Sequence, residues 1–136
     1  ADQWKVIYFY PKDDTPGCTT EACTIAEVYD EFNALGVTVL GVSKDSSASH
    51  KKFAEKYQLP FTLLSDESTE MIQAYGAWQE KSMFGKRYMG IQRMSYLIDP
   101  EGAVAKVYPK VDPATHAAEL LSDITQLKRA YTQTKR

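Results

Sequence analysis

Apolar runs and helical segments alternate along the first part of this chain, and this order restricts the fold more than any other feature. Residues 6–10 form an apolar and aromatic run that Pro11 ends, which predicts a buried strand leading into a loop. Residues 20–35 then carry apolar side chains three or four positions apart, the spacing of a helix, before Gly36. Residues 37–43 form a second apolar run. Strands that are apolar on both faces need helices on both sides, so the sequence predicts an α/β fold with a mixed central sheet covered on both faces.

The rest of the chain continues this alternation and ends in a hairpin and a helix. The order βαβαβαββα is what a thioredoxin-like fold produces, and a length of 136 residues suits a single domain over residues 1–136. The further predicted elements are a helix at 46–57, a strand at 61–64, a short helix at 70–75, hairpin strands at 95–98 and 104–108, and a final helix at 114–131.

Residues 76–90 are polar, aromatic and punctuated by glycine, so we expect a long loop there. Met83, Phe84 and Tyr88 within this loop either fill gaps beside the core or form an apolar docking rim. Trp78 is expected in the core. A loop of this length is typical of a functional segment.

Charge and composition exclude several function classes. Sixteen basic and eighteen acidic side chains give a net charge of -2, which provides no general attraction for nucleic acid or an anionic membrane. No run approaches the ~18 apolar residues of a membrane helix, and the first residues lack the features of a signal peptide. We therefore expect a cytoplasmic protein with no nucleic acid and no membrane among its partners. Two cysteines are too few for a secreted disulfide framework, so they should be catalytic, redox-active or merely buried.

Cys18 lies where a strand end leads into a helix. Thr15 is a suitable N-cap residue and Pro16 a suitable first helical residue, which places Cys18 in the first helical turn. Unpaired backbone N–H groups and the positive end of the helix dipole favour a thiolate there, so the position predicts a reactive sulfur near neutral pH. The alternative is a small buried core residue, the commonest fate of a lone cysteine.

Other chemistry has little support in the sequence. His50 and His116 lie in predicted helices, where we expect solvated or capping roles. Two cysteines and two histidines could nominally bind zinc, but a C-x₄-C spacing with distant histidines matches no usual zinc finger. The sequence has no C-x-x-C, phosphate-binding glycine loop or H-E-x-x-H pattern.

Pro11, Thr15 and Cys18 reproduce the peroxiredoxin signature of proline, three residues, threonine, two residues and cysteine. The surrounding sequence resembles the branch of that family called bacterioferritin comigratory protein or peroxiredoxin Q. The matching runs lie at 8–13, 15–23, 49–53 and 63–66, and the resemblance continues to the closing helix. The family carries an N-terminal hairpin before its first strand, where this sequence has only residues 1–5. Either the sequence is truncated or this member is short, and in both cases we expect an exposed sheet edge.

The resemblance implies a role for each matching residue. It makes Cys18 the peroxidatic cysteine, with Thr15 orienting the peroxide and Pro11 shielding the sulfur from water. Arg93 matches an arginine just before a strand, whose guanidinium would stabilise both the thiolate and the charge on the leaving oxygen. Glu21 matches a glutamate that holds an arginine in place. Taken without the family, Arg93 could be a surface residue at a strand edge, and Glu21 an acidic residue favoured near a helix start.

Cys23 lies five residues after Cys18, the spacing of the resolving cysteine in many members of this branch. Alone, the spacing also fits a core residue on the helix face. A sulfenic acid on Cys18 needs a nearby thiol before it is oxidised further, which favours the resolving role. Five residues along a helix separate the Cα atoms by roughly 8.6 Å, beyond the ~4.4–6.8 Å of a disulfide. The bond would therefore require local unfolding between the two cysteines.

The sequence thus predicts a thiol peroxidase that reduces hydrogen peroxide and organic hydroperoxides without metal, flavin or haem. A thioredoxin-like protein would reduce the Cys18–Cys23 disulfide, and the enzyme would be a monomer or a weak homodimer. The alternative is a redox sensor or switch that uses the same cysteines without efficient peroxide turnover. Such a switch would not need Thr15 and Arg93.

Overall fold

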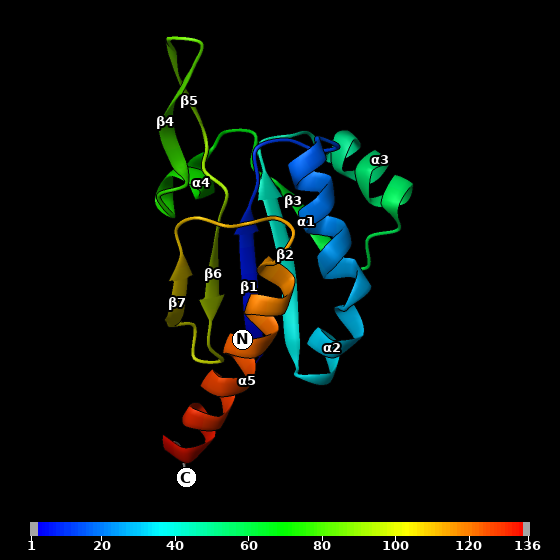
Figure 1. Ribbon diagram of the computed structural model, residues 1–136, viewed down its shortest axis with the longest axis vertical. Coiled ribbons are helices and arrows are strands. Elements are labelled where there is room, and N and C mark those ends of the chain that lie inside the picture. Colours follow the sequence, from blue (N-terminus) through cyan, green and yellow to red (C-terminus); the bar gives the residue numbers. More distant parts are fainter. Residues whose placement is uncertain (1–2, 135–136) are drawn as a thin grey trace.

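A mixed five-stranded sheet forms the centre of the protein in a computed structural model that describes residues 3–134 (Figure 1). The strands stand in the order β3-β2-β1-β6-β7. β1 pairs in parallel with β2, and β2 with β3, whereas β6 is antiparallel to both β1 and β7. The strands of this sheet are β1 (Trp4–Phe9), β2 (Val37–Ser43), β3 (Thr62–Ser65), β6 (Met94–Ile98) and β7 (Val104–Tyr108).

Both faces of the sheet are covered, as predicted. Side chains alternate along β1, so Val6 and Tyr8 join one core cluster while Ile7 and Phe9 join the other. The first cluster packs against α1 and α5 and the second against α4. The helices are α1 (Pro16–Glu27), α2 (Tyr29–Ala34), α3 (Ser47–Tyr57), α4 (Glu70–Ala74) and α5 (His116–Thr134). No helix within residues 3–134 is long and apolar enough to cross a membrane.

The helical stretch predicted at 20–35 is not continuous. The helix begins at Pro16, the start that Thr15 and Pro16 predict, and Val28 interrupts it with a backbone that is not helical (φ -113, ψ 19). Ile25 and Phe32, on either side of the break, are both fully buried. Because seven residues make two helical turns, a continuous helix would also place these two side chains on one face. The apolar spacing therefore contained no sign of the break.

The loop predicted at 76–90 is also wrong, because these residues form a hairpin of β4 (Trp78–Met83) and β5 (Lys86–Ile91). Phe84 and Gly85 make a two-residue turn in which both have positive φ (53 and 78). Most side chains of the hairpin are exposed, so the alternation of apolar and polar residues that predicts a strand is missing. Trp78 packs against the second core cluster, as expected, and the rest of the hairpin projects beyond the sheet (Figure 1).

Candidate active site

The loop between β1 and α1 places Cys18 at the end of the sheet. Thr15 has the extended backbone of an N-cap residue and Pro16 occupies the first helical position, as the sequence predicts. The Thr15 hydroxyl does not cap the helix, however, since it donates to the Lys12 carbonyl at 2.9 Å. Cys18 lies in the first turn, where backbone N–H groups have no partner within the helix.

Cys18 is buried, with 1% of its surface exposed, yet its sulfur has a charged partner. Nη2 of Arg93 lies 3.4 Å from Sγ of Cys18, and Nη1 of the same guanidinium lies 2.9 Å from Oε1 of Glu21. The preceding Gly17 leaves room for this arrangement, because a Cβ at that position would meet Nη2 at 2.9 Å. The structure thus brings together Cys18, Arg93 and Glu21, three of the residues singled out in the sequence.

The buried Glu21 carboxyl is only partly satisfied. Its Oε2 has no hydrogen-bond partner, and burial raises the pKa of Glu21 to about 7 despite the opposing effect of Arg93. Burial by itself would lower the pKa of Arg93, but Cys18 and Glu21 outweigh it and raise the pKa above its usual value. The site therefore holds a permanent cation beside the sulfur and a carboxyl that titrates near neutrality.

Cys23 lies further along the same helix and is half-buried; both cysteines are free thiols. Burial, with a contribution from Glu27, raises the pKa of the Cys23 thiol. Pro11 and Thr15 are half-buried in the loop that precedes the helix. The roles of all six residues singled out in the sequence remain predictions: Pro11, Thr15, Cys18, Glu21, Cys23 and Arg93.

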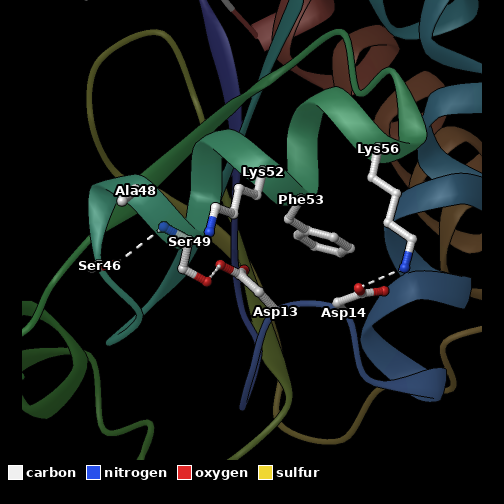
Figure 2. A pocket seen from close by; sticks show the side chains of 8 residues that line it. All are labelled: Asp13, Asp14, Ser46, Ala48, Ser49, Lys52, Phe53 and Lys56. Carbon is white, nitrogen blue, oxygen red and sulfur yellow. Dashed lines mark hydrogen bonds and ion pairs between the residues drawn. The ribbon is translucent and has the colours of Figure 1, made fainter.

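A second polar cluster anchors the same loop and was missed in the sequence. The Asp13 carboxylate accepts hydrogen bonds from Tyr10 (2.6 Å), Ser49 (2.7 Å) and Nδ1 of His50 (2.7 Å). Burial by itself would raise the pKa of Asp13, but these three donors outweigh it and lower the pKa. Figure 2 shows the Ser49 bond, and beside it the ion pair of Lys56 with Asp14 (2.8 Å) that ties the next loop residue to α3.

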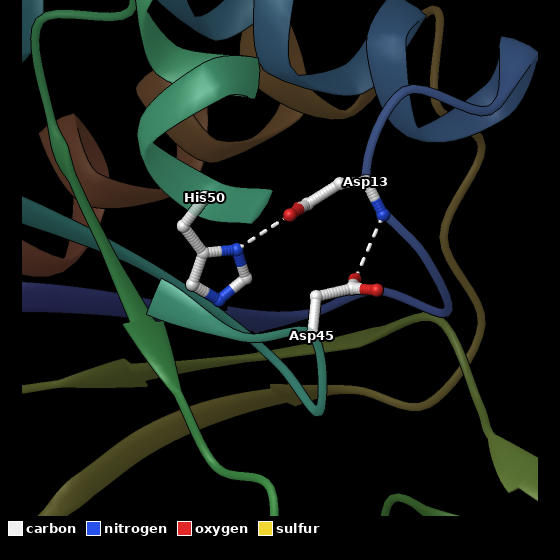
Figure 3. A group of neighbouring side chains, drawn as sticks. All are labelled: Asp13, Asp45 and His50. Atoms are coloured by element: carbon white, nitrogen blue, oxygen red, sulfur yellow. Dashed lines mark hydrogen bonds and ion pairs between the residues drawn. The ribbon is translucent and has the colours of Figure 1, made fainter. Parts of the chain in front are cut away.

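The expectation that His50 is solvated or capping is wrong. Its ring is buried, and Nε2 lies 3.0 Å from the Leu64 carbonyl while Nδ1 faces Asp13 (Figure 3). Burial alone would lower the pKa of His50, but Asp13 outweighs it and raises the pKa. Both ring nitrogens face acceptors, which suits the doubly protonated imidazolium. His50 lies three residues before the buried Phe53, a helical spacing that could have predicted its burial.

Asp13, Asp45 and His50 place their ligand atoms within 4.8 Å of one another, the composition of a small metal site. Their polar atoms already have partners, however. Oδ2 of Asp45 accepts from the Asp13 backbone N–H (2.9 Å, Figure 3) and from Ser43 (2.7 Å). A cation would have to displace these donors, so the cluster fits a structural network better than a metal centre.

His116 is likewise buried and not solvated. Its Nδ1 lies 2.8 Å from Oε1 of Glu119 and its Nε2 lies 2.8 Å from the Ser95 hydroxyl. Burial lowers the pKa of His116, in spite of Glu119, so a neutral ring is favoured. The helix α5 turns this face toward the core, and Ser95 is itself fully buried, which leaves no path for a substrate.

A thioredoxin-like sheet with a cysteine in the first turn of a helix, bonded to a half-buried arginine that a buried glutamate holds, defines a thiol-dependent peroxidase of the peroxiredoxin class. The sequence profile of the AhpC/TSA family matches residues 1–107. The chain is 51% identical to a peroxiredoxin Bcp of Coxiella burnetii over 85% of its own length and 77% of the relative's. It is 47% identical to the peroxiredoxin Bcp of Bacillus subtilis over 90% and 78% of the two chains.

Solved structures agree with these relatives. The fold superposes on Xanthomonas campestris peroxiredoxin Q with a TM-score of 0.89 and 43% identity, over 93% of this chain and 80% of that one. A Xylella fastidiosa homologue gives a TM-score of 0.90 at 36% identity, over 94% and 79% of the two chains. The chain belongs to the AhpC/TSA family, in its Bcp or peroxiredoxin Q branch, and it is a peroxidase.

Proposed function

We propose that this peroxidase reduces hydrogen peroxide and organic hydroperoxides through Cys18. The observation that carries the proposal is the Arg93 guanidinium, which bonds Sγ of Cys18 and is held by Glu21. A related Xanthomonas campestris structure was solved to study alkyl peroxide reduction, which supports organic hydroperoxides as substrates. Arg93 would stabilise the thiolate and then the negative charge on the departing oxygen.

The thiolate of Cys18 attacks the terminal oxygen of the hydroperoxide, and the O–O bond breaks. The terminal OH stays on sulfur as a sulfenic acid, and the other oxygen leaves as an alkoxide that takes a proton to give the alcohol. The sulfur loses two electrons and the peroxide gains them, so no metal or organic cofactor is required. Thr15 would orient the peroxide and Pro11 would keep water from the sulfur.

Cys23 then resolves the sulfenic acid by forming a disulfide with Cys18 and releasing water. Both cysteines lie in the same continuous helix, so this bond requires the first turns of α1 to open. Gly17, Thr19 and Thr20 are weak helix formers, which makes this segment easier to open than the turns after it. A thioredoxin-like dithiol would reduce the exposed disulfide and return both thiols.

An assay coupled to a thioredoxin system tests the proposal with two variants. We expect Cys18→Ser to abolish peroxide loss, because a serine hydroxyl does not ionise near neutral pH. Cys23→Ser should consume one equivalent of peroxide and then stall at the sulfenic acid. Turnover by Cys18→Ser would refute the proposal, and rapid disulfide formation without multiple turnover would favour a redox switch.

Amide hydrogen exchange tests the opening of α1. The protein carrying an intramolecular Cys18–Cys23 bond, identified by mass, should lose protection between residues 18 and 26 relative to the reduced protein. Unchanged protection there would rule out the opening, and a disulfide found only between chains would rule out intrachain resolution.

A further inference from the structure

The tip of the β4–β5 hairpin places a large apolar side chain where neither burial nor backbone preference favours it. Phe84 is 97% exposed and has a φ of 53, and Gly85 follows with a φ of 78. Two-residue turns of this kind prefer asparagine, aspartate or glycine, since a bulky residue is strained at positive φ. Met83, Tyr88 and Met89 nearby are also exposed. Folding alone does not account for this tip.

Basic residues accompany the apolar side chains of the hairpin. The strand register pairs Met83 with Lys86 and Lys81 with Tyr88, so these four side chains share one face, which has no acidic residue between them. Residues 78–91 contain three basic and one acidic side chain, in a chain whose net charge is -2. The acidic one, Glu80, pairs with Arg87 on the opposite face (3.4 Å), so Lys81 and Lys86 supply the positive charge of the face that carries Met83. The hairpin is therefore a cationic and apolar projection from an otherwise anionic protein.

The hairpin projects from the same end of the molecule at which α1 begins, the end that holds Cys18 (Figure 1). Arg93 follows two residues after β5, and the backbone bond from Gln92 to Ala77 (2.7 Å) closes the hairpin beside it. The pKa of Lys81 is lowered by burial and by the charge of Arg93, and Cys18 only partly opposes this shift. The face of the hairpin that carries Lys81 therefore lies within the electrostatic field of the site. The hairpin therefore lies at the end of the molecule that holds Cys18.

We propose that the hairpin tip docks the enzyme on an anionic lipid surface and presents Cys18 to hydroperoxides of the lipid chains. Phe84 and Met83 would enter the interface, while Lys86, on the same face as Met83, would lie against the headgroups. The proposal rests on the peroxidase chemistry of the previous section and narrows its substrate class. The step is the same: the lipid hydroperoxide becomes the alcohol and Cys18 becomes the sulfenic acid.

A lipid surface fits this tip better than a protein partner. Stable protein interfaces cover roughly 800 Å² on each side and about 20–30 residues, whereas the hairpin offers four apolar side chains at a narrow end. Insertion of one or two aromatic or aliphatic side chains together with a few cations is the usual pattern of peripheral membrane binding.

The variant Phe84→Asn tests the proposal, because asparagine is tolerated at positive φ and cannot enter the apolar interface. We expect this variant to keep or raise the melting temperature and to reduce hydrogen peroxide at the wild-type rate. Sedimentation with vesicles of phosphatidylcholine and phosphatidylglycerol should weaken roughly tenfold, and reduction of phospholipid hydroperoxide in those vesicles should slow in proportion. Val104→Ser, which removes an exposed apolar side chain from β7, is the matched control and should change neither.

Charge and salt provide a second measurement. The variant Lys86→Glu reverses one charge beside Met83 and should reduce vesicle binding by roughly tenfold, and added salt should weaken binding of the wild type. Vesicles of phosphatidylcholine alone should bind little. Failure of the wild type to sediment with anionic vesicles would overturn the proposal.

Two further outcomes separate this proposal from others. If Phe84→Asn slowed hydrogen peroxide turnover by raising the KM for the thioredoxin-like reductant, the tip would be a docking site for that protein and the lipid proposal would be wrong. If the wild type sedimented with vesicles but reduced no peroxide, the peroxidase mechanism would fail, and with it the substrate class, while the docking itself would stand.

Discussion

The two buried carboxyl groups on either side of Cys18 differ in how many hydrogen bonds they accept and in the direction of their pKa shifts. Asp13, in the loop before the cysteine, accepts three side-chain hydrogen bonds and has a lowered pKa. Glu21, one turn after the cysteine, has one cationic partner, an oxygen without a partner and a pKa raised to about 7. The contrast shows that full satisfaction fixes the loop in place, whereas incomplete satisfaction leaves a charge that can respond to pH beside the sulfur.

The largest expected effect comes from removing the cation that Glu21 holds. Arg93→Met should lower peroxide turnover by roughly 100- to 1,000-fold, the usual cost of losing a fixed group that stabilises charge in the transition state. The pH profile of Cys18 alkylation should move to higher pH, because the thiolate loses its partner. Arg93→Lys keeps the charge but cannot bond Cys18 and Glu21 at once, so it should recover only a small part of the rate. Full activity in either variant would contradict the assigned role of Arg93.

The variant Asp13→Asn tests the carboxylate that accepts three hydrogen bonds. Weakening this buried acceptor should destabilise the protein by about 2–3 kcal/mol in urea unfolding. The pKa of Asp13 is lowered, so its contribution is lost as pH falls; the pKa of His50 is raised, so its contribution is lost as pH rises. The difference between variant and wild type should therefore be greatest between about pH 4.5 and 6.5. Asp14→Asn, at an exposed ion pair, is the control and should leave the urea midpoint unchanged.

The variant Glu21→Gln tests the partly satisfied carboxyl through the pH dependence of stability and activity. The folded protein binds more protons at Glu21 than the unfolded chain does between pH 4.5 and about 7, so stability falls as pH rises through this window. The variant should lack this fall, which amounts to at most about 3 kcal/mol. Its activity should match the wild type near pH 5.5 and be about tenfold lower at pH 8, where the ionised carboxylate positions Arg93. A constant activity ratio across this range would show that Glu21 does not titrate there.

The smallest effect is expected for Ser49→Ala, which removes one of the three donors to Asp13. The loss should be about 1 kcal/mol of unfolding free energy, with the rate of peroxide reduction unchanged. Ser46→Ala, which removes the N-cap of the same helix, should cost a similar amount without moving the pKa of Asp13. A large loss of activity in Ser49→Ala would mean that the loop anchor and the catalytic side are not separate.

The buried parts of the fold were predictable, because strands such as β1 and β2 are apolar on both faces and their runs begin and end near the observed bounds. The exposed β4–β5 hairpin was not, since its side chains have no buried face to impose a pattern. Trp78, which does reach the core, was correctly expected there.

The residues of the candidate site also divide into those that local sequence predicts and those that it does not. The position of Cys18 at the helix start followed from Thr15 and Pro16, whereas Arg93 and Glu21 were reached only through resemblance to a family. Their contact links positions 72 residues apart, and no local pattern encodes such a pair. Asp13 was missed for a related reason, because a loop acid looks solvated until tertiary contacts surround it. The spacing of His50 from Phe53 could have predicted burial of the histidine, but not its contact with Asp13.

At Gly17, the stability of the helix and the geometry of the active site favour different residues. It is helical and its φ is not positive, so alanine there is conformationally allowed and should strengthen the start of α1 by about 0.5–1 kcal/mol. The same methyl group would displace the guanidinium of Arg93 from the sulfur. Gly17→Ala would therefore favour the start of α1 and weaken the contact of Arg93 with Cys18, so helix propensity and peroxidase activity favour different residues at this position.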